Sequence, residues 1–466
     1  MHHTQFSNMG RRRFIGFAGA SLAGAALIGC TGGSKTSAPA ASNTSGSAGT
    51  AAAPAASVKP ASEITFWSAA PASSKAVDEE LVKRFQAKFP DIKVKYEVQG
   101  SNYAELSDKL AASIAAKTAP DVAMLSDVWW FKYAAAKQTV PVDDLLKHPL
   151  LKEAGFDQAD YVDSLMKDYQ FNGKQWGMPY ARSTPLFYYN KSVWQAAGLP
   201  DRGPKTWSEM DEWATKIMPK MGAGKFAFTN GKGSSYIAWT FHAVIWQFGG
   251  HYSDEKFNLL MNSPEGIAAG NYVRDQIFKM KYANVTSASE TDDFVAGQTA
   301  SIISSTGGLK GILERSKGKF EVGTAFLPEA KQFGCPTGGA GLSIMSSSSP
   351  EKQLAAALFI AFATSPENTA YYSQNTGYMP VRKSAATGPM AEFFKTNPQF
   401  KTAVDQLAKT QPQESARVWI PGGDAIIGTG LERMVLKNED PKDVWPDVIK
   451  QLEKEAAPIK KQIGLS

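Results

Sequence analysis

S-T-P-L-F-Y-Y-N-K, residues 183–191, is the stretch of sequence that decides the fold. Its first three residues predict a turn, and the next four form an apolar, aromatic run that predicts a buried strand. Thirteen residues further on, P-K-T-W begins a helix, because Thr206 can cap it and Glu209 stands three places later. A turn, a strand and a capped helix are therefore expected in this order.

Length and composition predict a globular protein with two lobes. The chain has 466 residues, and single hydrophobic cores stop growing near ~250–300 residues. It is 43% hydrophobic and 20% charged, as globular proteins are. The net charge of +6 falls to near balance without Arg11, Arg12 and Arg13, which lie in a segment that holds no acidic residue. No basic run interleaved with aromatic residues occurs, so nucleic-acid binding is not indicated.

Residues 1–29 have the features of an export signal. R-R-R at 11–13 has a twin-arginine look, and the small, apolar run 16–28 is too short to span a bilayer as a mature helix. L-I-G-C, residues 27–30, resembles the bacterial lipobox, which implies cleavage before Cys30 and lipidation of its sulfur. The alternative is an ordinary cleaved signal followed by a coincidental cysteine.

Residues 30–62 are expected to form a disordered tether, because Ala, Ser, Thr, Gly and Pro bury too little apolar area to offset the entropy of ordering. The second cysteine, Cys335, has no partner if Cys30 is lipidated, so no intramolecular disulfide is expected. No later apolar run is long enough to span a membrane. The mature protein is therefore expected to be lipid-anchored to the outer face of the cell membrane, or periplasmic.

From residue 63 onward, strands and helices alternate. Strands are predicted at 63–68, 92–98 and 122–125, with amphipathic helices at 76–89 and 103–116 between them. This order predicts an α/β sheet with helices on its faces. Ligands of open α/β sheets bind beyond the carboxyl ends of the strands, which here carry Trp67, Tyr103 and Asp127.

The S-T-P…Y-Y-N-K…P-K-T-W pattern resembles the segment at which extracellular solute-binding proteins of ABC importers first cross between lobes. The resemblance extends along the chain, and within the family it is strongest to the glycerol-3-phosphate-binding proteins. The further motifs that carry it are F-W-S (66–68), A-P-D-V (119–122), F-V-A-G-Q-T-A-S-I-I-S-S-T-G-G (294–308), G-G-A-G-L-S-I-M (338–345), S-P-E-N (365–368) and N-T-G-Y-M-P-V (375–381).

This resemblance implies the type II periplasmic-binding-protein fold, with two α/β lobes, three interlobe crossings and a ligand cleft between the lobes. The crossings are expected near 179–183, 304–308 and 340–345. Lobe 1 is then 63–181 plus 308–342, and lobe 2 is 183–305 plus 344–466.

The resemblance also implies which residues contact the solute. Carried over position by position, Tyr103 and Asp127 lie on the side of lobe 1, with Asp127 in place of a family glutamate. Tyr236 or Trp239 takes the place of the stacking tryptophans that relatives carry. The positions that match phosphate- and polyol-contacting residues are Ser183, Ser305, Gly339 and Tyr378.

One departure from the family pattern concerns the phosphate. The family's phosphate-contacting arginine should fall within 417–427, where Asp424 or Ala425 stands instead. A carboxylate facing a phosphate is repulsive, so either Arg417 or Arg182 supplies the cation, or the ligand is not a simple phosphate monoester. A carboxylate with aromatic residues suits a sugar, or the choline-like cation of a glycerophosphodiester.

The expected function is that of a monomeric receptor that captures glycerol-3-phosphate or a glycerophosphodiester such as glycerophosphocholine and delivers it to an ABC permease. No cofactor, metal or catalysis is expected, because no H-E-x-x-H, G-x-S-x-G, P-loop or C-x-x-C motif occurs. The first alternative is a mono- or oligosaccharide receptor. The second is an exported hydrolase, for which Asp292 and Asp293 are the candidate carboxylates.

Overall fold

The computed structural model describes residues 58–465. The predicted export signal, Cys30 and most of the predicted tether lie outside the described residues. The prediction that the tether extends to residue 62 was wrong at its end, because Val58 and Ala61 pack against a hydrophobic core and the Ala61 amide donates to Glu351 O (2.9 Å). Among the described helices, none is long and apolar enough to cross a membrane.

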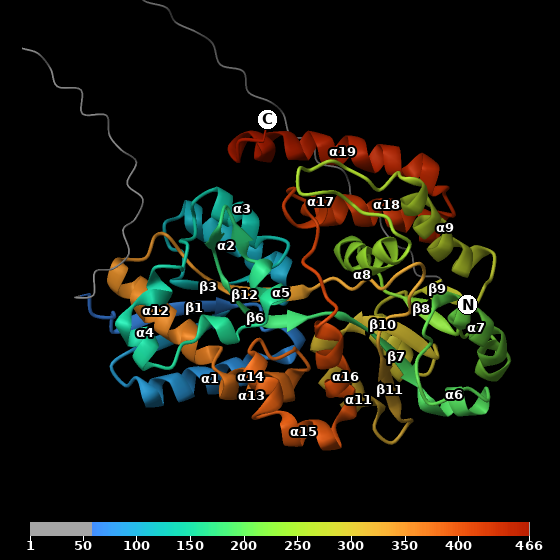
Figure 1. The fold of residues 1–466 in the computed structure, drawn as a ribbon, viewed down its shortest axis with the longest axis horizontal. Coiled ribbons are helices and arrows are strands. Elements are labelled where there is room, and N and C mark those ends of the chain that lie inside the picture. Colours follow the sequence, from blue (N-terminus) through green and yellow to red (C-terminus); the bar gives the residue numbers. More distant parts are fainter. Residues whose placement is uncertain (1–57, 466) are drawn as a thin grey trace, which may run out of the picture. The chain divides into compact units, whose positions relative to one another are not determined.

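The first lobe is built on a five-stranded sheet in the order β2-β1-β3-β12-β6 (Figure 1). The pairs β1–β2 and β1–β3 are parallel, whereas β12 runs antiparallel to β3 and β6. Its strands are β1 (Glu63–Ser68), β2 (Lys93–Val98), β3 (Val122–Ser126), β6 (Met178–Ser183) and β12 (Gly338–Ile344). The helices before the crossing to the second sheet are α1 (Lys75–Lys88), α2 (Tyr103–Ala115), α3 (Trp130–Ala135), α4 (Pro149–Glu153) and α5 (Asp163–Lys167), and a hairpin of β4 (Gln170–Phe171) and β5 (Lys174–Gln175) follows them.

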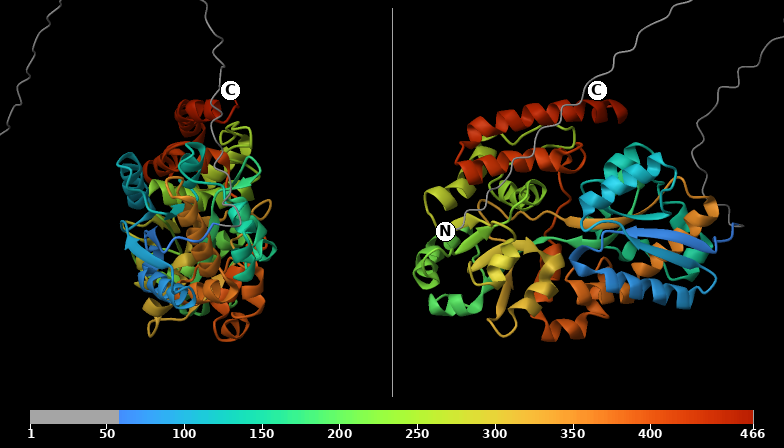
Figure 2. Two further views of the ribbon diagram at one scale, coloured as in Figure 1. Left: turned by 90° about the vertical axis from the view of Figure 1, so that its left-hand side faces the viewer. Right: turned by 180° about the vertical axis from the view of Figure 1, so that it is seen from behind.

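The second lobe is built on a sheet in the order β11-β7-β10-β8-β9, in which β7 is antiparallel to both of its neighbours. Its strands are β7 (Pro185–Asn190), β8 (Phe228–Asn230), β9 (Ala283–Val285), β10 (Ser301–Ser305) and β11 (Val322–Ala325). Its helices include α6 (Lys191–Ala196), α7 (Trp207–Met221), α8 (Ser234–Gln247), α9 (Pro264–Phe278), α10 (Glu290–Val295), α11 (Leu309–Ser316), α16 (Pro398–Leu407), α17 (Ser415–Val418), α18 (Gly423–Lys437) and α19 (Pro441–Gln462). Figures 1 and 2 show the two sheets in separate halves, with α18 and α19 stacked on the outer side of the second.

The strand and the capped helix predicted from the opening stretch are confirmed. β7 covers residues 185–190, and Thr206 caps α7, with its Oγ1 accepting from the Glu209 amide (3.0 Å). The first crossing falls within this stretch, because Thr184 alone separates β6 of the first sheet from β7 of the second.

The first crossing is tied to two other segments. Thr184 is fully buried, and its carbonyl accepts from the Thr306 amide (3.0 Å). The Nε2 amide of Gln406, in α16, donates to Thr184 Oγ1 (3.2 Å) and Pro185 O (2.8 Å), while its Oε1 accepts from the Leu327 amide (2.9 Å). The buried thiol of Cys335 lies beside the same crossing, with Sγ 3.8 Å from Pro185 O. These contacts define the hinge of the molecule.

The expected positions of the other two crossings were wrong. The chain does not leave the second lobe at 304–308, because β11 still pairs with β7 and the chain returns to the first sheet only at β12. It does not leave the first lobe within 340–345 either. The side chains of α12 (Pro350–Ala363) belong to the core of the first sheet, and so does Val381, which follows α13 (Pro366–Thr376). The final passage lies beyond Val381, where α14 (Lys383–Thr387) and α15 (Ala391–Thr396) lead to α16.

Helix α8 is held close to α18 by a glycine. A Cβ atom at Gly428 would lie 1.7 Å from Ser234 O, so no larger residue allows this approach. The N-terminal end of α8, which carries Tyr236 and Trp239, is thereby fixed against α18.

Gly339→Ala is expected to lower the free energy of unfolding by about 1–3 kcal/mol. Gly339 has φ +100°, and its added Cβ would lie 2.1 Å from Ala181 O. Gly311→Ala, in α11, is the matched control, because nothing lies within 4 Å of its added Cβ; it should raise stability by about 0.5–1 kcal/mol. Urea denaturation of both variants measures the difference, and equal stabilities would contradict the close packing of β12 on β6.

Candidate functional site

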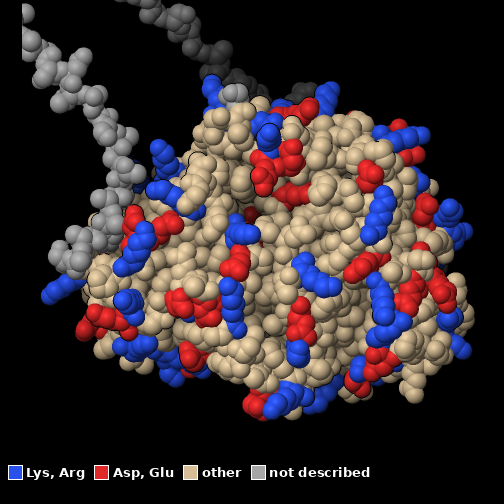
Figure 3. All heavy atoms as spheres, in the orientation of Figure 1, with Lys and Arg blue, Asp and Glu red and all other residues tan. Residues whose placement is uncertain are grey.

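The surface is hollowed between the lobes. Figure 3 shows this hollow near the middle of the face, at a position that in Figure 1 lies between α2–α3 and α17–α8. Basic and acidic side chains are interspersed on the face around it, in agreement with the near balance of charge in the sequence. Candidate residues come to this region from the start of α2, the end of β3, the start of β12, α8 and the end of α13.

Tyr103 and Tyr378 meet directly. Their hydroxyl oxygens are 3.2 Å apart, although they are far apart in the sequence. Burial raises the pKa of Tyr103 well above its ordinary value and that of Tyr378 to about 12, so both hydroxyls stay protonated and can donate. A Cβ at Gly307 would lie 2.7 Å from Tyr378 Cζ, which places the second-lobe segment after β10 against this ring.

A chain of hydrogen bonds links a carboxylate of the first lobe to a guanidinium of the second. Asp127 follows β3, and its Oδ2 accepts from Gln413 Nε2, while Gln413 Oε1 accepts from Arg417 NH1. Arg417 NH2 also donates to Ser235 O (3.1 Å), but the buried Nε has no acceptor among the described residues. Asp127 and Arg417 are therefore neighbours through one amide side chain, with a guanidinium N–H left for another acceptor.

Tyr236 lies beside Ser304 and Ser305. Its hydroxyl accepts from the Ser305 amide (3.1 Å) and is 3.1 Å from Ser304 Oγ, which donates to Glu290 Oε1 (2.8 Å). The Oγ of Ser305 accepts from the Gly307 amide (3.1 Å). Burial and the charge of Glu290 raise the pKa of Tyr236 well above its ordinary value.

Trp239 packs beside Tyr236, with ring centroids 5.7 Å apart, and its Nε1 donates to Thr337 O (2.9 Å). Ser183 and Gly339 belong to the paired strands β6 and β12, where Gly338 pairs with Ser183. The Gly339 carbonyl accepts from the Asp127 amide (2.9 Å). The aromatic side chains of α8 and the backbone around Asp127 are thus joined through the first residues of β12.

Arg182 is fully buried, and its charge is paired inside the first lobe. One NH group donates to Tyr169 Oη (3.1 Å) and the other to the Asp168 carboxylate. Its Nε has no acceptor among the described residues. Because Asp168 already neutralises Arg182, Arg417 is the better candidate of the two cations considered for an anionic solute.

Within residues 58–465, Trp67 and Asp424 form no hydrogen bond or aromatic pair with the other candidate residues. Trp67 donates from Nε1 to Glu97 Oε2 (2.8 Å) on the neighbouring strand. Asp424 lies in the first turn of α18 and is 3% exposed. Burial lowers the pKa of Lys132, and the charges of Asp108 and Asp424 act against this shift, which places Asp424 near a lysine of the first lobe.

Sequence reasoning missed three residues of this region: Gln413, Glu290 and Lys132. Gln413 lies in Q-P-Q-E-S, which has no motif to mark it. Ser304 and Ser305 are adjacent polar residues at the end of the apolar run of β10, and nothing in this run indicates that Glu290 would be the partner of Ser304. No group of three or more His, Cys, Asp or Glu side chains within 58–465 is arranged to hold a metal ion.

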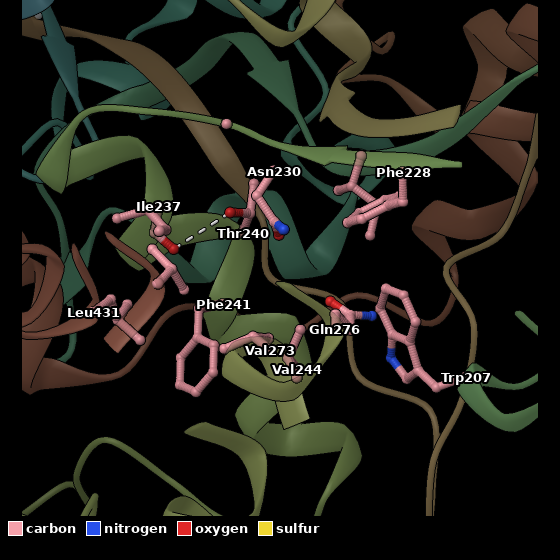
Figure 4. Close-up of a pocket in the computed structure, with 13 residues that line it drawn as sticks. Trp207, Phe228, Asn230, Ile237, Thr240, Phe241, Val244, Val273, Gln276 and Leu431 are labelled. Carbon is pink, nitrogen blue, oxygen red and sulfur yellow. Dashed lines mark hydrogen bonds between the residues drawn. The ribbon is translucent and has the colours of Figure 1, made fainter. Parts of the chain in front are cut away.

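An enclosed pocket inside the second lobe is a separate feature. It is lined by apolar residues of α7, α8, α9 and α18, with Asn230, Thr240 and Gln276 as its polar members (Figure 4). Its interior space is about 30 Å³, which is room for roughly one water molecule. It is too small for a sugar or a glycerol phosphate.

Aromatic rings join the two lobes beside the hollow. The rings of Phe131, in the first lobe, and Trp419, which follows α17, are stacked with centroids 4.6 Å apart and planes at 8°. Phe171 of the β4–β5 hairpin meets the same indole edge-on at 5.7 Å. Gln462 Nε2, at the end of α19, donates to Ala135 O (2.6 Å). These contacts hold the lobes together on one side of the hollow.

The loop after β1 is held by a buried carboxylate. Asp78 accepts from Tyr180 (2.7 Å), Tyr96 (3.0 Å), Ser74 (3.1 Å) and Ser68 (3.3 Å), all through hydroxyl groups. Burial raises the pKa of Asp78 to about 6, although the four hydroxyls act to lower it.

Comparison with known proteins assigns the chain to a family and its fold to one class. Residues 80–402 match the family model described as bacterial extracellular solute-binding protein, so the chain belongs to that family. Its structural neighbours are two-lobe periplasmic binding proteins with a sheet in each domain, as predicted from the sequence.

Particular relatives narrow the comparison. UgpB from Mycobacterium tuberculosis, solved in complex with glycerophosphocholine, is 44% identical, with a TM-score of 0.80 over 86% of this chain and 99% of that one. The sn-glycerol-3-phosphate-binding periplasmic protein UgpB of Escherichia coli K12 is 28% identical over 400 residues, in an alignment that covers 82% of this chain and 87% of the relative. Maltose-bound MalE3 of T. maritima, at 24% identity and a TM-score of 0.72 over 84% of this chain and 99% of that one, shares the fold.

Trp419→Ala is expected to loosen the contact between the lobes, because it removes both aromatic contacts. An aromatic pair contributes about 0.5–1.5 kcal/mol beyond its buried area, so the loss of two pairs should raise the population of the open form about fivefold to a hundredfold. Small-angle scattering of the solute-free protein should give a larger radius of gyration for this variant. Trp419→Phe, which keeps a ring, is the control; identical scattering from the two variants would mean that the stacking does not hold the lobes.

Asp78→Asn is expected to remove a pH-dependent part of the stability. The pKa of Asp78 rises from 3.8 to about 6 on folding, so the folded protein binds this proton more tightly. The wild type should therefore lose about 2 kcal/mol relative to the variant as the pH rises from 4 to 7. Urea denaturation across this range tests the difference, with the exposed Asp91→Asn as control. A constant difference would show that Asp78 titrates normally.

Proposed function

We propose that this protein is the solute receptor of an ABC importer and captures a glycerophosphodiester such as glycerophosphocholine, with glycerol-3-phosphate as a related solute. The proposal is supported most by the buried Arg417 guanidinium, which lies next to the Asp127 carboxylate and keeps one N–H without an acceptor among the described residues. The relatives that carry the names of these solutes agree with it.

Arg417 is the proposed partner of the phosphate. A buried guanidinium N–H without an acceptor is costly, and an anionic oxygen would supply a charge-assisted hydrogen bond. Gln413 already bonds NH1, and Ser235 O bonds NH2, so the guanidinium is held in place before the solute arrives. Preorganisation of this kind reduces the entropy cost of binding.

The glycerol hydroxyls are proposed to bind on the side of the first lobe. Asp127 offers a carboxylate acceptor, and the paired hydroxyls of Tyr103 and Tyr378 can donate or accept. Ser183 and Ser305 add hydroxyl groups, and Gly339 allows the solute to approach the backbone closely. These residues lie on the paired strands β6 and β12 and at the end of β10.

The remaining candidates suit the far end of a diester. Asp424 is a buried carboxylate of α18, and Tyr236 and Trp239 present aromatic rings on α8, which packs against α18. A carboxylate together with aromatic rings favours a quaternary ammonium group, so we place the choline of the diester towards Asp424. A phosphate monoester has no ammonium group to bind at Asp424 and the aromatic rings. A neutral sugar has no anionic oxygen to bind Arg417. Trp67 is proposed to have only a peripheral role.

The remaining parts of the proposal concern transport. The receptor is proposed to be anchored through a lipid on Cys30, to close about its hinge on the solute, and to release the solute unchanged to a permease. It is proposed to act as a monomer and to carry out no chemistry; the exported hydrolase is the competing view, and Asp292 pairs with Arg315 on the surface.

Arg417→Gln is expected to weaken glycerophosphocholine binding about tenfold to a hundredfold, because hydrogen bonds to a charged group contribute about 1.5–3 kcal/mol each. Titration calorimetry on the protein without its tether measures this loss. Arg315→Gln, at an exposed arginine, is the matched control and should bind as the wild type does.

The same titrations with glycerol-3-phosphate and a panel of sugars test the choice of solute. Tight binding of a sugar with no response to glycerophosphocholine would overturn the proposal in favour of a sugar receptor. Turnover of any of these compounds would favour the hydrolase.

A further inference from the structure

Glu414 accepts an unusual number of donors. Its Oε1 accepts from Trp246 Nε1 (2.6 Å) and lies 2.6 Å from His251 Nδ1. Its Oε2 accepts from the amides of Tyr252 (2.6 Å) and Ser253 (3.2 Å) and lies 3.2 Å from Nε2 of the buried His242. A single carboxylate thus ties the start of α17 to α8 and to the loop that follows α8.

This carboxylate stands directly beside the residues that form the chain to Asp127. Gln413 precedes it, and Arg417 follows three positions later. On the other side, the segment is fixed by backbone pairing, since the Gln411 amide donates to Cys335 O (3.1 Å) and its carbonyl accepts from the Thr337 amide (2.9 Å). Gln413 is therefore held between two anchors, one of backbone and one of side chain.

We infer that Glu414 is a positioning residue for solute binding: it fixes the segment 411–417 so that Gln413 and Arg417 face Asp127 across the two lobes. This inference rests on the proposed function of Arg417. Glu414 has no hydrogen bond with Asp127, and its carboxylate is bonded to α8 and to the loop that follows α8.

The charges around Glu414 support a fixed anion at this place. Burial acts to raise the pKa of Glu414, but the neighbouring His242, His251 and Trp246 outweigh it and leave the pKa well below its ordinary value. The hydrogen bond with Glu414 raises the pKa of His251, whereas burial lowers that of His242. The titratable groups that face the carboxylate are His242 of α8 and His251 of the following loop, and the charge of Arg417, from the same segment as Glu414, acts to lower the pKa of His242.

The test combines solute binding with local amide exchange. Glu414→Gln should weaken the binding of glycerophosphocholine about tenfold. The substitution replaces one acceptor oxygen with an NH2 group, which cannot accept hydrogen bonds from the donors that surround the carboxylate. In a variant that already carries Gln413→Ala and Arg417→Ala, Glu414→Gln should cause no further loss of affinity, because the side chains that Glu414 positions are absent. Hydrogen exchange of the solute-free protein should become faster within 411–419 and remain unchanged elsewhere. Glu453→Gln, exposed on α19, is the matched control.

Should Glu414→Gln fail to fold, His251→Ala removes one partner at a half-exposed position and should show the same local exchange and a smaller loss of affinity. Equal binding by wild type and Glu414→Gln, or losses that simply add in the double background, would overturn the inference. If the wild type binds no glycerophosphocholine, the proposed function fails, but the exchange data still test whether Glu414 fixes the segment. Unchanged exchange of residues 411–419 in Glu414→Gln would disprove that role of Glu414.

Discussion

The hydrogen bonds of Gln406 at the hinge are the constraint on which the rest of the structure depends. A receptor with two sheets must let the chain pass between them without leaving buried polar groups unpaired. Here one fully buried amide side chain serves the first crossing at Thr184 and Pro185 and, through its other atom, the connection at Leu327. Two passages of the chain between the lobes are therefore joined at one point.

The charges of the candidate site are arranged across this hinge and not within one lobe. Asp127 belongs to the first lobe and Arg417 to the second, with Gln413 between them. The link between these two charges therefore depends on the contact between the lobes. By contrast, Arg182 and Asp168 are paired inside one lobe, where their interaction does not depend on the distance between the lobes.

Sequence patterns predicted the local structure well and the passages between lobes less well. The strand of residues 185–190 and the cap at Thr206 depend on neighbouring residues, so composition and spacing were sufficient for them. The position of the second crossing depends on which sheet a short strand joins. Residues 322–325 pair with β7 through backbone atoms, so their side chains do not indicate this pairing. Likewise, Tyr103 and Tyr378 could be placed together only by resemblance to a family, and Gln413 could not be predicted at all.

Cys335 gives the hinge a chemical property of its own. Its thiol is buried beside Pro185 O, and burial raises its pKa, so almost no thiolate is present and disulfide exchange is slow. An exported protein can therefore keep this cysteine reduced in an oxidising compartment without a bond that would lock the lobes. The rate of alkylation of this thiol therefore measures how often the crossing opens far enough to expose the sulfur.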